Sequence, residues 1–267
     1  MRKLLLPVLA LVVLAPFLYM VSISFMGETE LLRWPPPLFP RAPTLDNYAA
    51  MLQALPFSRV LLNTAIVAGA VMIAQVLTSA AAGYALARAR FPGRDGIITA
   101  ALTLLSLPAI VLLIPRFLMI QAIGWTDSYA GLISTELVSI WGIFLMRQAF
   151  LMQPREVEDA ARLDGAGEWT LFWRVTMPLA RPSVAALALI AFLDQWRSFL
   201  WPLVITTSRR MEVAEVALAH VHTAYAANWP YQMAAAVLLT LPLLLICLLA
   251  QRYMMPAVSA RGADIRL

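Results

Sequence analysis

Hydrophobic residues along this chain gather in long runs separated by short polar segments. Six runs are of the length, about 20 residues, that an α-helix needs to cross the hydrocarbon of a bilayer. Only helices and closed barrels satisfy their own backbone hydrogen bonds there. The pattern therefore predicts an all-α membrane protein with a single transmembrane domain over 1–267 and spans at 4–26, 61–87, 97–123, 129–146, 184–205 and 233–249.

Three of these runs carry ionisable residues. Arg116 lies in the third, Glu136 in the fourth, and Asp194 with Arg197 in the fifth. Such residues are costly in a membrane and usually face the bundle interior or a water-filled path. The four charged residues are therefore candidates for a solute pathway, and Trp196, the neighbour of Arg197, is included with them.

Three of these charges have simpler interpretations as well. Asp194 and Arg197 are three residues apart on one helix face, so they could neutralise each other as an ion pair or contact a solute. Arg116 follows Pro115 near the outer end of its run and could instead extend to the lipid headgroups.

Composition supports a membrane location and argues against nucleic acid as a partner. Hydrophobic residues make up 61% of the chain and charged residues only 13%, too few to cover the surface of a soluble domain. The net charge is +5, but the basic residues are scattered between apolar runs and form no stripe. Cys247 is the only cysteine, so the chain forms no internal disulfide.

The basic residues instead indicate topology, because Lys and Arg in short loops are retained in the cytoplasm. With the N-terminus inside, 13 of the 20 Lys and Arg residues fall in cytoplasmic segments and five fall outside. Both termini and the loop at 152–182 are therefore predicted to be cytoplasmic. His220 and His222, in an outer loop, are two residues apart and so on different faces of a helix; no metal site is predicted.

The loop at 152–182 contains a short helix with a small apolar face. Pro154 followed by Glu156, Glu158 and Asp159 is typical of a helix start, and Gly165 of a helix stop. Val157, Ala160 and Ala161 follow the i, i+3, i+4 pattern of one face. Small side chains allow close approach, so we expect a soluble partner to bind here; an amphipathic element on the lipid headgroups is the alternative.

A second helical stretch follows in the same loop. Trp169, Phe172 and Trp173 repeat the same spacing and predict an aromatic patch. Pro178 is expected to end this helix, and Pro182 to open the fifth span.

This loop resembles the EAA loop of ABC importer permeases. The resemblance rests on Asp159-Ala160-Ala161, Asp164-Gly165-Ala166, Phe172 and Met177-Pro178-Leu179 at matching spacing. Further segments resemble the carbohydrate branch of the family, of the maltose and glycerol-phosphate type. They include Asn47-Tyr48, Asn63-Thr64, Tyr84-Ala85-Leu86-Ala87-Arg88, Phe91-Pro92-Gly93, Gly142 to Gln148, Phe199-Leu200-Trp201-Pro202-Leu203 and Gln251-Arg252-Tyr253.

The resemblance implies a type I ABC importer permease fold and a coupling helix that inserts into a groove of an ATPase subunit. The residues it assigns to this coupling are Glu156, Glu158, Asp159, Ala160, Ala161, Asp164, Gly165 and Ala166. Asp159 stands where the family usually has Glu, which shortens one contact. After Trp196 this chain has Arg197, where the family commonly has Asn. An Arg can bind phosphate or carboxylate through two hydrogen bonds. An anionic solute is therefore an alternative to a neutral sugar.

The implied partners are a second permease subunit, an ATPase dimer and an extracytoplasmic binding protein, in the inner membrane of a bacterium. The chain has no glycine-rich G-x-x-x-x-G-K loop, so we expect ATP and Mg²⁺ to bind to the partner ATPase and this chain to have no catalytic residues or cofactor. Two rival functions remain open. In a proton-coupled secondary transporter, Glu136 and Asp194 would relay protons; a structural or enzyme-anchoring membrane subunit would transport nothing.

Overall fold

The computed structural model describes residues 2–262, with side chains for 8–249. The described residues form helices and no strand, which confirms the predicted all-α class. They divide into two compact units: unit 1 comprises Met1–Asn63 and Glu212–Leu245, and unit 2 comprises Thr64–Met211 and Ile246–Leu267. The long helix α3, Phe57–Arg88, contributes to both units.

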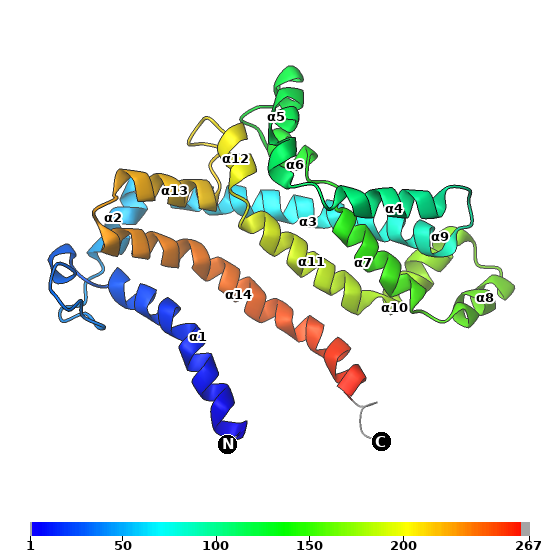
Figure 1. Ribbon diagram of the computed structural model, residues 1–267, viewed down its shortest axis with the longest axis horizontal. Coiled ribbons are helices and arrows are strands. Elements are labelled where there is room, and N and C mark those ends of the chain that lie inside the picture. Colours follow the sequence, from blue (N-terminus) through cyan, green and yellow to red (C-terminus); the bar gives the residue numbers. More distant parts are fainter. Residues whose placement is uncertain (1, 263–267) are drawn as a thin grey trace. The chain divides into compact units, whose positions relative to one another are not determined.

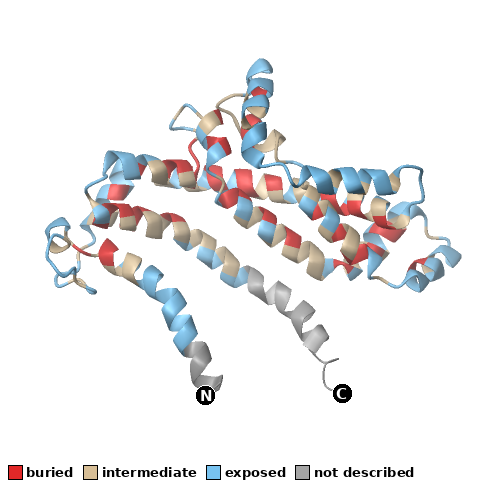
Figure 2. Ribbon diagram, in the orientation of Figure 1, coloured by how far each residue is buried: buried red, intermediate tan, exposed pale blue. Residues whose placement is uncertain are grey.

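Unit 1 packs around a small apolar core. Met51, Val60 and Ala217 are among its fully buried members. Helix α1 is exposed over most of its described length (Figure 2). The helices of unit 1 besides α3 are α1 (Arg2–Ser24), η1 (Glu28–Glu30), α2 (Asp46–Ala54), α13 (Ala214–Ala224) and the first part of α14 (Trp229–Gly262).

Unit 2 holds both candidate sites. Its core joins Phe150 and Met146 to Phe172 and Leu187, with the Tyr84 ring 5.2 Å from that of Phe172. Helices α7 and α11 lie side by side (Figure 1). Besides α3, the helices of unit 2 are α4 (Arg94–Leu104), η2 (Ala109–Leu112), α5 (Leu113–Ala122), α6 (Tyr129–Ser134), α7 (Ile140–Leu151), α8 (Arg155–Leu163), α9 (Glu168–Thr170), η3 (Leu171–Thr176), α10 (Met177–Leu179), α11 (Arg181–Trp196), α12 (Leu200–Ile205) and the last part of α14.

Among the described residues, two helices are long and apolar enough to cross a membrane unbroken: α3 and the Trp229–Leu249 part of α14. They match the predicted second and sixth spans. Two shorter helices are also apolar: Val8–Ser24 lies within the first predicted span, and Ile140–Leu151 overlaps the end of the fourth.

The expectation of one continuous helix over 97–123, 129–146 and 184–205 is wrong. The third breaks between α4 and η2, where the axis bends by 96° and Pro108 lies. The fourth breaks between α6 and α7, and the fifth between α11 and α12, near its charged residues. Proline lacks a backbone donor, and polar residues compete for backbone hydrogen bonds, so helices end where these residues occur.

Candidate functional site

Helix α8 in the predicted cytoplasmic loop begins and ends where the sequence indicated. Pro154 precedes its first residue with φ −58° and ψ 133°. At its end Gly165 adopts φ +84°, and its amide donates to the Arg162 carbonyl while the Ala166 amide donates to that of Ala161, both at 3.0 Å. This pair of hydrogen bonds is the Schellman motif, which a left-handed glycine permits. The predicted helix of the loop is therefore confirmed.

The predicted small face of α8 is open to solvent. Val157 and Ala160 are exposed, and Ala161 is half-buried. The remaining residues that the sequence assigned to ATPase coupling are also mostly accessible: Glu156, Asp159, Asp164 and Gly165 are exposed, and Ala166 is half-buried.

Glu158 differs from the rest of this set because it is buried. Its Oε1 lies 2.7 Å from Nε of Arg88, the last residue of α3, and the two side chains are only 6% and 7% exposed. Ala160 is two residues further on and so lies on nearly the opposite side of the helix. Glu158 therefore attaches α8 to α3 inside the protein and does not present a charge to a partner.

A chain of hydrogen bonds extends this anchor. Nη2 of Arg88 donates to the Gln153 carbonyl, and Nε2 of Gln153 donates to the Thr176 carbonyl, both at 3.0 Å. These contacts join the end of α3, the α7–α8 turn and η3. Through these contacts the start of α8 is tied to two neighbouring helices.

The predicted aromatic patch is only partly a surface feature. Phe172 is buried in the core of unit 2, whereas Trp169 is 77% exposed. Trp173 is half-exposed and stacks edge-on against Phe172 at 4.8 Å. The helical segment continues through η3, a π-helical turn, and ends at Leu179, one residue after Pro178, so the predicted end of this helix is confirmed.

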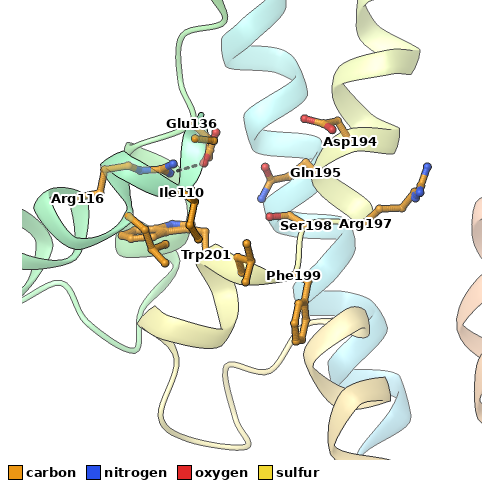
Figure 3. A pocket seen from close by; sticks show the side chains of 12 residues that line it. Ile110, Arg116, Glu136, Asp194, Gln195, Arg197, Ser198, Phe199 and Trp201 are labelled. Carbon is orange, nitrogen blue, oxygen red and sulfur yellow. Dashed lines mark hydrogen bonds and ion pairs between the residues drawn. The ribbon is translucent and has the colours of Figure 1, made fainter. Parts of the chain in front are cut away.

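The second candidate site is a cavity of about 540 Å³ in unit 2. Four of the five predicted pathway residues line it: Arg116, Glu136, Asp194 and Arg197 (Figure 3). The fifth, Trp196, does not; it is buried and packs on Phe192 at 5.5 Å.

Arg116 is fixed on three sides. It pairs with Glu136, donates to Oγ1 of Thr135 at 2.6 Å, and lies 4.5 Å from the ring centroid of Trp201. A cation over an indole face gains further stabilisation. The expectation that Arg116 extends to the headgroups is therefore wrong: the guanidinium forms part of the cavity wall.

Asp194 and Arg197 do not form the ion pair that their spacing allowed. Within the described residues no ion pair joins them, and their side chains point in different directions in Figure 3. Because Arg197 follows directly after the end of α11, helix spacing no longer sets its direction.

The cavity also contains residues that the search for charged groups in the spans could not find. Trp201 forms the surface under Arg116, and its Nε1 donates to the Gly131 carbonyl at 3.2 Å. Gln195 is buried at the cavity with its amide nitrogen unpartnered among the described residues. The only signal for Gln195 in the sequence is that it is itself polar and directly follows Asp194.

The outer-loop histidines form no metal cluster among the described residues. His220 does, however, lie near an acidic residue: its Nδ1 is 3.1 Å from Oε1 of Glu212.

Known proteins resemble this chain over almost its whole length. It is 31% identical over 257 residues to the arabinooligosaccharides transport system permease protein AraQ of Halalkalibacterium halodurans, covering 95% of this chain and 92% of that protein. It is 32% identical over 252 residues to the sn-glycerol-3-phosphate transport system permease protein UgpE of Rhizobium meliloti, covering 91% and 89%.

The fold is also found in solved structures. One is a bacterial ABC transporter involved in the import of the acidic polysaccharide alginate, with a TM-score of 0.80, 22% identity and 94% of each chain covered. Another is the alginate transporter in complex with an alginate pentasaccharide-bound periplasmic protein, with a TM-score of 0.69, 16% identity, and 93% of this chain and 91% of that chain covered. Residues 75–260 match the family described as the binding-protein-dependent transport system inner membrane component, and this chain belongs to that family.

Proposed function

We propose that this chain is a permease subunit of an ATP-driven importer that takes up a carbohydrate or related solute. The observation that carries the proposal is helix α8, whose Val157 and Ala160 are exposed while Glu158 is buried and fixed by its pair with Arg88. A helix held in this way can receive a push from a soluble ATPase and pass it to α3. ATP and Mg²⁺ bind to that ATPase, and this chain has no catalytic residues.

The chain forms a single transmembrane domain with six spans and both termini in the cytoplasm. Support comes from the two long apolar helices, the two shorter ones, Val8–Ser24 and Ile140–Leu151, the bent pair Arg94–Leu104 with Ala109–Ala122, and Arg181–Trp196, whose bent partner Glu168–Leu179 belongs to the predicted cytoplasmic loop. The uneven distribution of Lys and Arg favours this orientation. The membrane is the bacterial inner membrane, which the name of the family supports.

Two further partners complete the importer. An extracytoplasmic binding protein delivers the solute, in keeping with the family name and with the complex formed by the alginate transporter. A second permease subunit forms the other half of the pathway; the wide exposure of the charged cavity residues Asp194 and Arg197 supports this, because charges in a bilayer face a bundle interior or a water-filled path and not lipid.

The solute passes the cavity lined by Arg116, Glu136, Asp194 and Arg197. A sugar fits a cavity that combines carboxylates, an amide and the Trp201 ring. Two relatives of this chain are named for the transport of arabinooligosaccharides and of sn-glycerol 3-phosphate. Because the second of these solutes is an anion, an anionic solute is the alternative. Binding assays on the cognate binding protein identify the solute. The Arg197→Glu variant then tests contact: unchanged uptake of an anionic solute excludes Arg197 as its ligand.

The docking role of α8 is tested by placing a bulky side chain on its outward face. Ala160→Trp should prevent co-purification of the ATPase subunit and abolish solute-stimulated ATP hydrolysis by the assembled transporter. Ala54→Trp, on the exposed surface of α2, is the matched control and should leave both intact. If the ATPase still co-purifies with Ala160→Trp, or after deletion of residues 156–167, α8 is not the docking element.

A further inference from the structure

A second charged cavity, of about 510 Å³, lies in unit 2 between the α3–α4 turn and the start of α8. Three arginines line it: Arg90 from the turn, Arg94 from the first position of α4, and Arg155 from the first position of α8. The cavity is separate from the solute cavity, with which it shares no residue.

The charge of this cavity is not balanced by the protein. Asp95 is the only acidic residue among those lining it, and its carboxylate lies 3.1 Å from Nε of Arg94. Within the described part of the chain, no carboxylate pairs with Arg90 or Arg155. Two guanidinium groups are therefore available to an anion, and a concave wall of one sign concentrates counter-ions.

The surface next to the cavity is apolar. Helix α4 starts at the cavity and exposes Ile97 (53%) and Leu104 (53%), and Phe91 in the turn is 37% exposed. The cavity thus lies at the junction of the polar turn and two apolar runs, 61–87 and 97–123. A phospholipid has the same arrangement of a charged headgroup joined to apolar chains.

We propose that this cavity binds the phosphate headgroup of an anionic phospholipid of the cytoplasmic leaflet. Guanidinium groups bind phosphate through paired hydrogen bonds, and basic cavities beside membrane helices on the cytoplasmic side are suited to such headgroups. The exposed apolar residues of α4 favour a lipid over a free phosphate. Because Arg155 opens α8, the headgroup also ties the coupling helix to the α3–α4 turn.

Native mass spectrometry of the intact transporter, titrated with phosphatidylglycerol or phosphatidylcholine, measures this binding. The wild type should retain phosphatidylglycerol preferentially. The double variant Arg90→Gln/Arg155→Gln should bind it about thirtyfold more weakly, since each basic residue near an anionic lipid surface contributes a factor of about five. Arg90→Lys/Arg155→Lys should keep most of the binding. Arg33→Gln/Arg41→Gln removes the same charge elsewhere and should keep all of it.

Three outcomes would overturn the proposal. The first is equal phosphatidylglycerol retention by wild type and Arg90→Gln/Arg155→Gln. The second is displacement of the lipid by an equal concentration of soluble glycerol 3-phosphate, which would assign the cavity to a free phosphate. The third is a variant that keeps the lipid but loses the ATPase subunit, which would assign the arginines to an acidic protein surface. Lipid retention is measured without transport, so its failure leaves the proposed import function standing.

Discussion

At the scale of single residues, the ion pair between Arg88 and Glu158 determines which side of α8 faces outward. Both side chains are almost fully buried, so the pair forms where water screens it little. Desolvation makes such a pair a weak source of net stability, but removal of one partner leaves the other charge buried and uncompensated. The pair therefore acts mainly to fix one position of the helix.

Glu158→Gln should strongly destabilise unit 2. Loss of one partner of a buried pair costs about 3–5 kcal/mol, and thermal unfolding of the purified protein in detergent measures it. Glu156→Gln, at an exposed position of the same helix, should change the melting temperature little. Arg88→Met/Glu158→Met should recover most of the loss, and a double variant as unstable as Glu158→Gln would contradict the assignment.

A glycine is required at position 165 because of the backbone conformation there, and not because a side chain would lack space. At φ +84° a Cβ is strained by about 1–2 kcal/mol, although no atom would lie within 4 Å of it. Gly165→Ala should therefore shift the end of α8 and reduce solute-stimulated ATP hydrolysis by the full transporter. Gly167→Ala, also exposed and open but without a positive φ, should preserve activity. Equal activities in the two variants would show that the Schellman turn has no role in coupling.

At the scale of elements, α3 and α7 pack in close contact at Gly83. A Cβ built there would lie 2.8 Å from the Arg147 backbone nitrogen and 2.9 Å from Cβ of Met146. Small residues let membrane helices approach this closely and gain from backbone contact.

Gly83→Ala should separate α3 from α7 and destabilise the protein by about 1–3 kcal/mol, the usual cost of overpacking. Gly69→Ala in the same helix meets no atom within 4 Å and should be neutral or slightly stabilising, because alanine favours helices. Thermal unfolding of both variants distinguishes these effects. Similar melting temperatures for the two would refute close packing at Gly83.

In the turn before α6, the hydrogen bonds of Asp127 should make the stability of the protein depend on pH. Oδ1 of Asp127 accepts hydrogen bonds from the amides of Thr207 and Ser208, both at 3.0 Å. Burial alone would raise the pKa of Asp127, but the hydrogen bonds from Ser208 and Thr207 hold that pKa below its ordinary value. A depressed pKa gives stability that is present above about pH 4 and is lost as the pH falls through the folded value.

Asp127→Asn should therefore lower the melting temperature at pH 7. The gap in melting temperature between this variant and wild type should become smaller as the pH falls below 4. Melting curves from pH 7 to pH 3 measure this gap. Asp95→Asn, whose carboxylate is 82% exposed, should show no comparable trend. A gap that stays constant with pH would mean that the Asp127 carboxylate is not the stabilising group.

Several elements could be predicted because local signals determine them. Pro154 and Gly165 mark the ends of α8, and long apolar runs mark α3 and α14. The breaks at Pro108 and after Trp196 were missed, since hydropathy averaged over a window does not register a single bend.

At the scale of the whole molecule, the sites depend on contacts that no local pattern contains. Arg88 and Glu158 are 70 residues apart, and Arg116 meets Trp201 across 85 residues, counted by their positions in the chain. The sequence could indicate that each charge in a span needs a partner, but only the fold shows which one. It also shows that the partner of Glu136 is Arg116.

The central claim is that ATP, and not a proton gradient, drives transport through this chain. The direct measurement is uptake into vesicles that contain both permease subunits, the ATPase and the binding protein, with an arabinooligosaccharide and glycerol 3-phosphate as probes. We predict uptake of at least one probe that requires ATP on the ATPase side and continues when a protonophore removes the proton gradient. Uptake that proceeds without ATP and stops with the protonophore would contradict the claim.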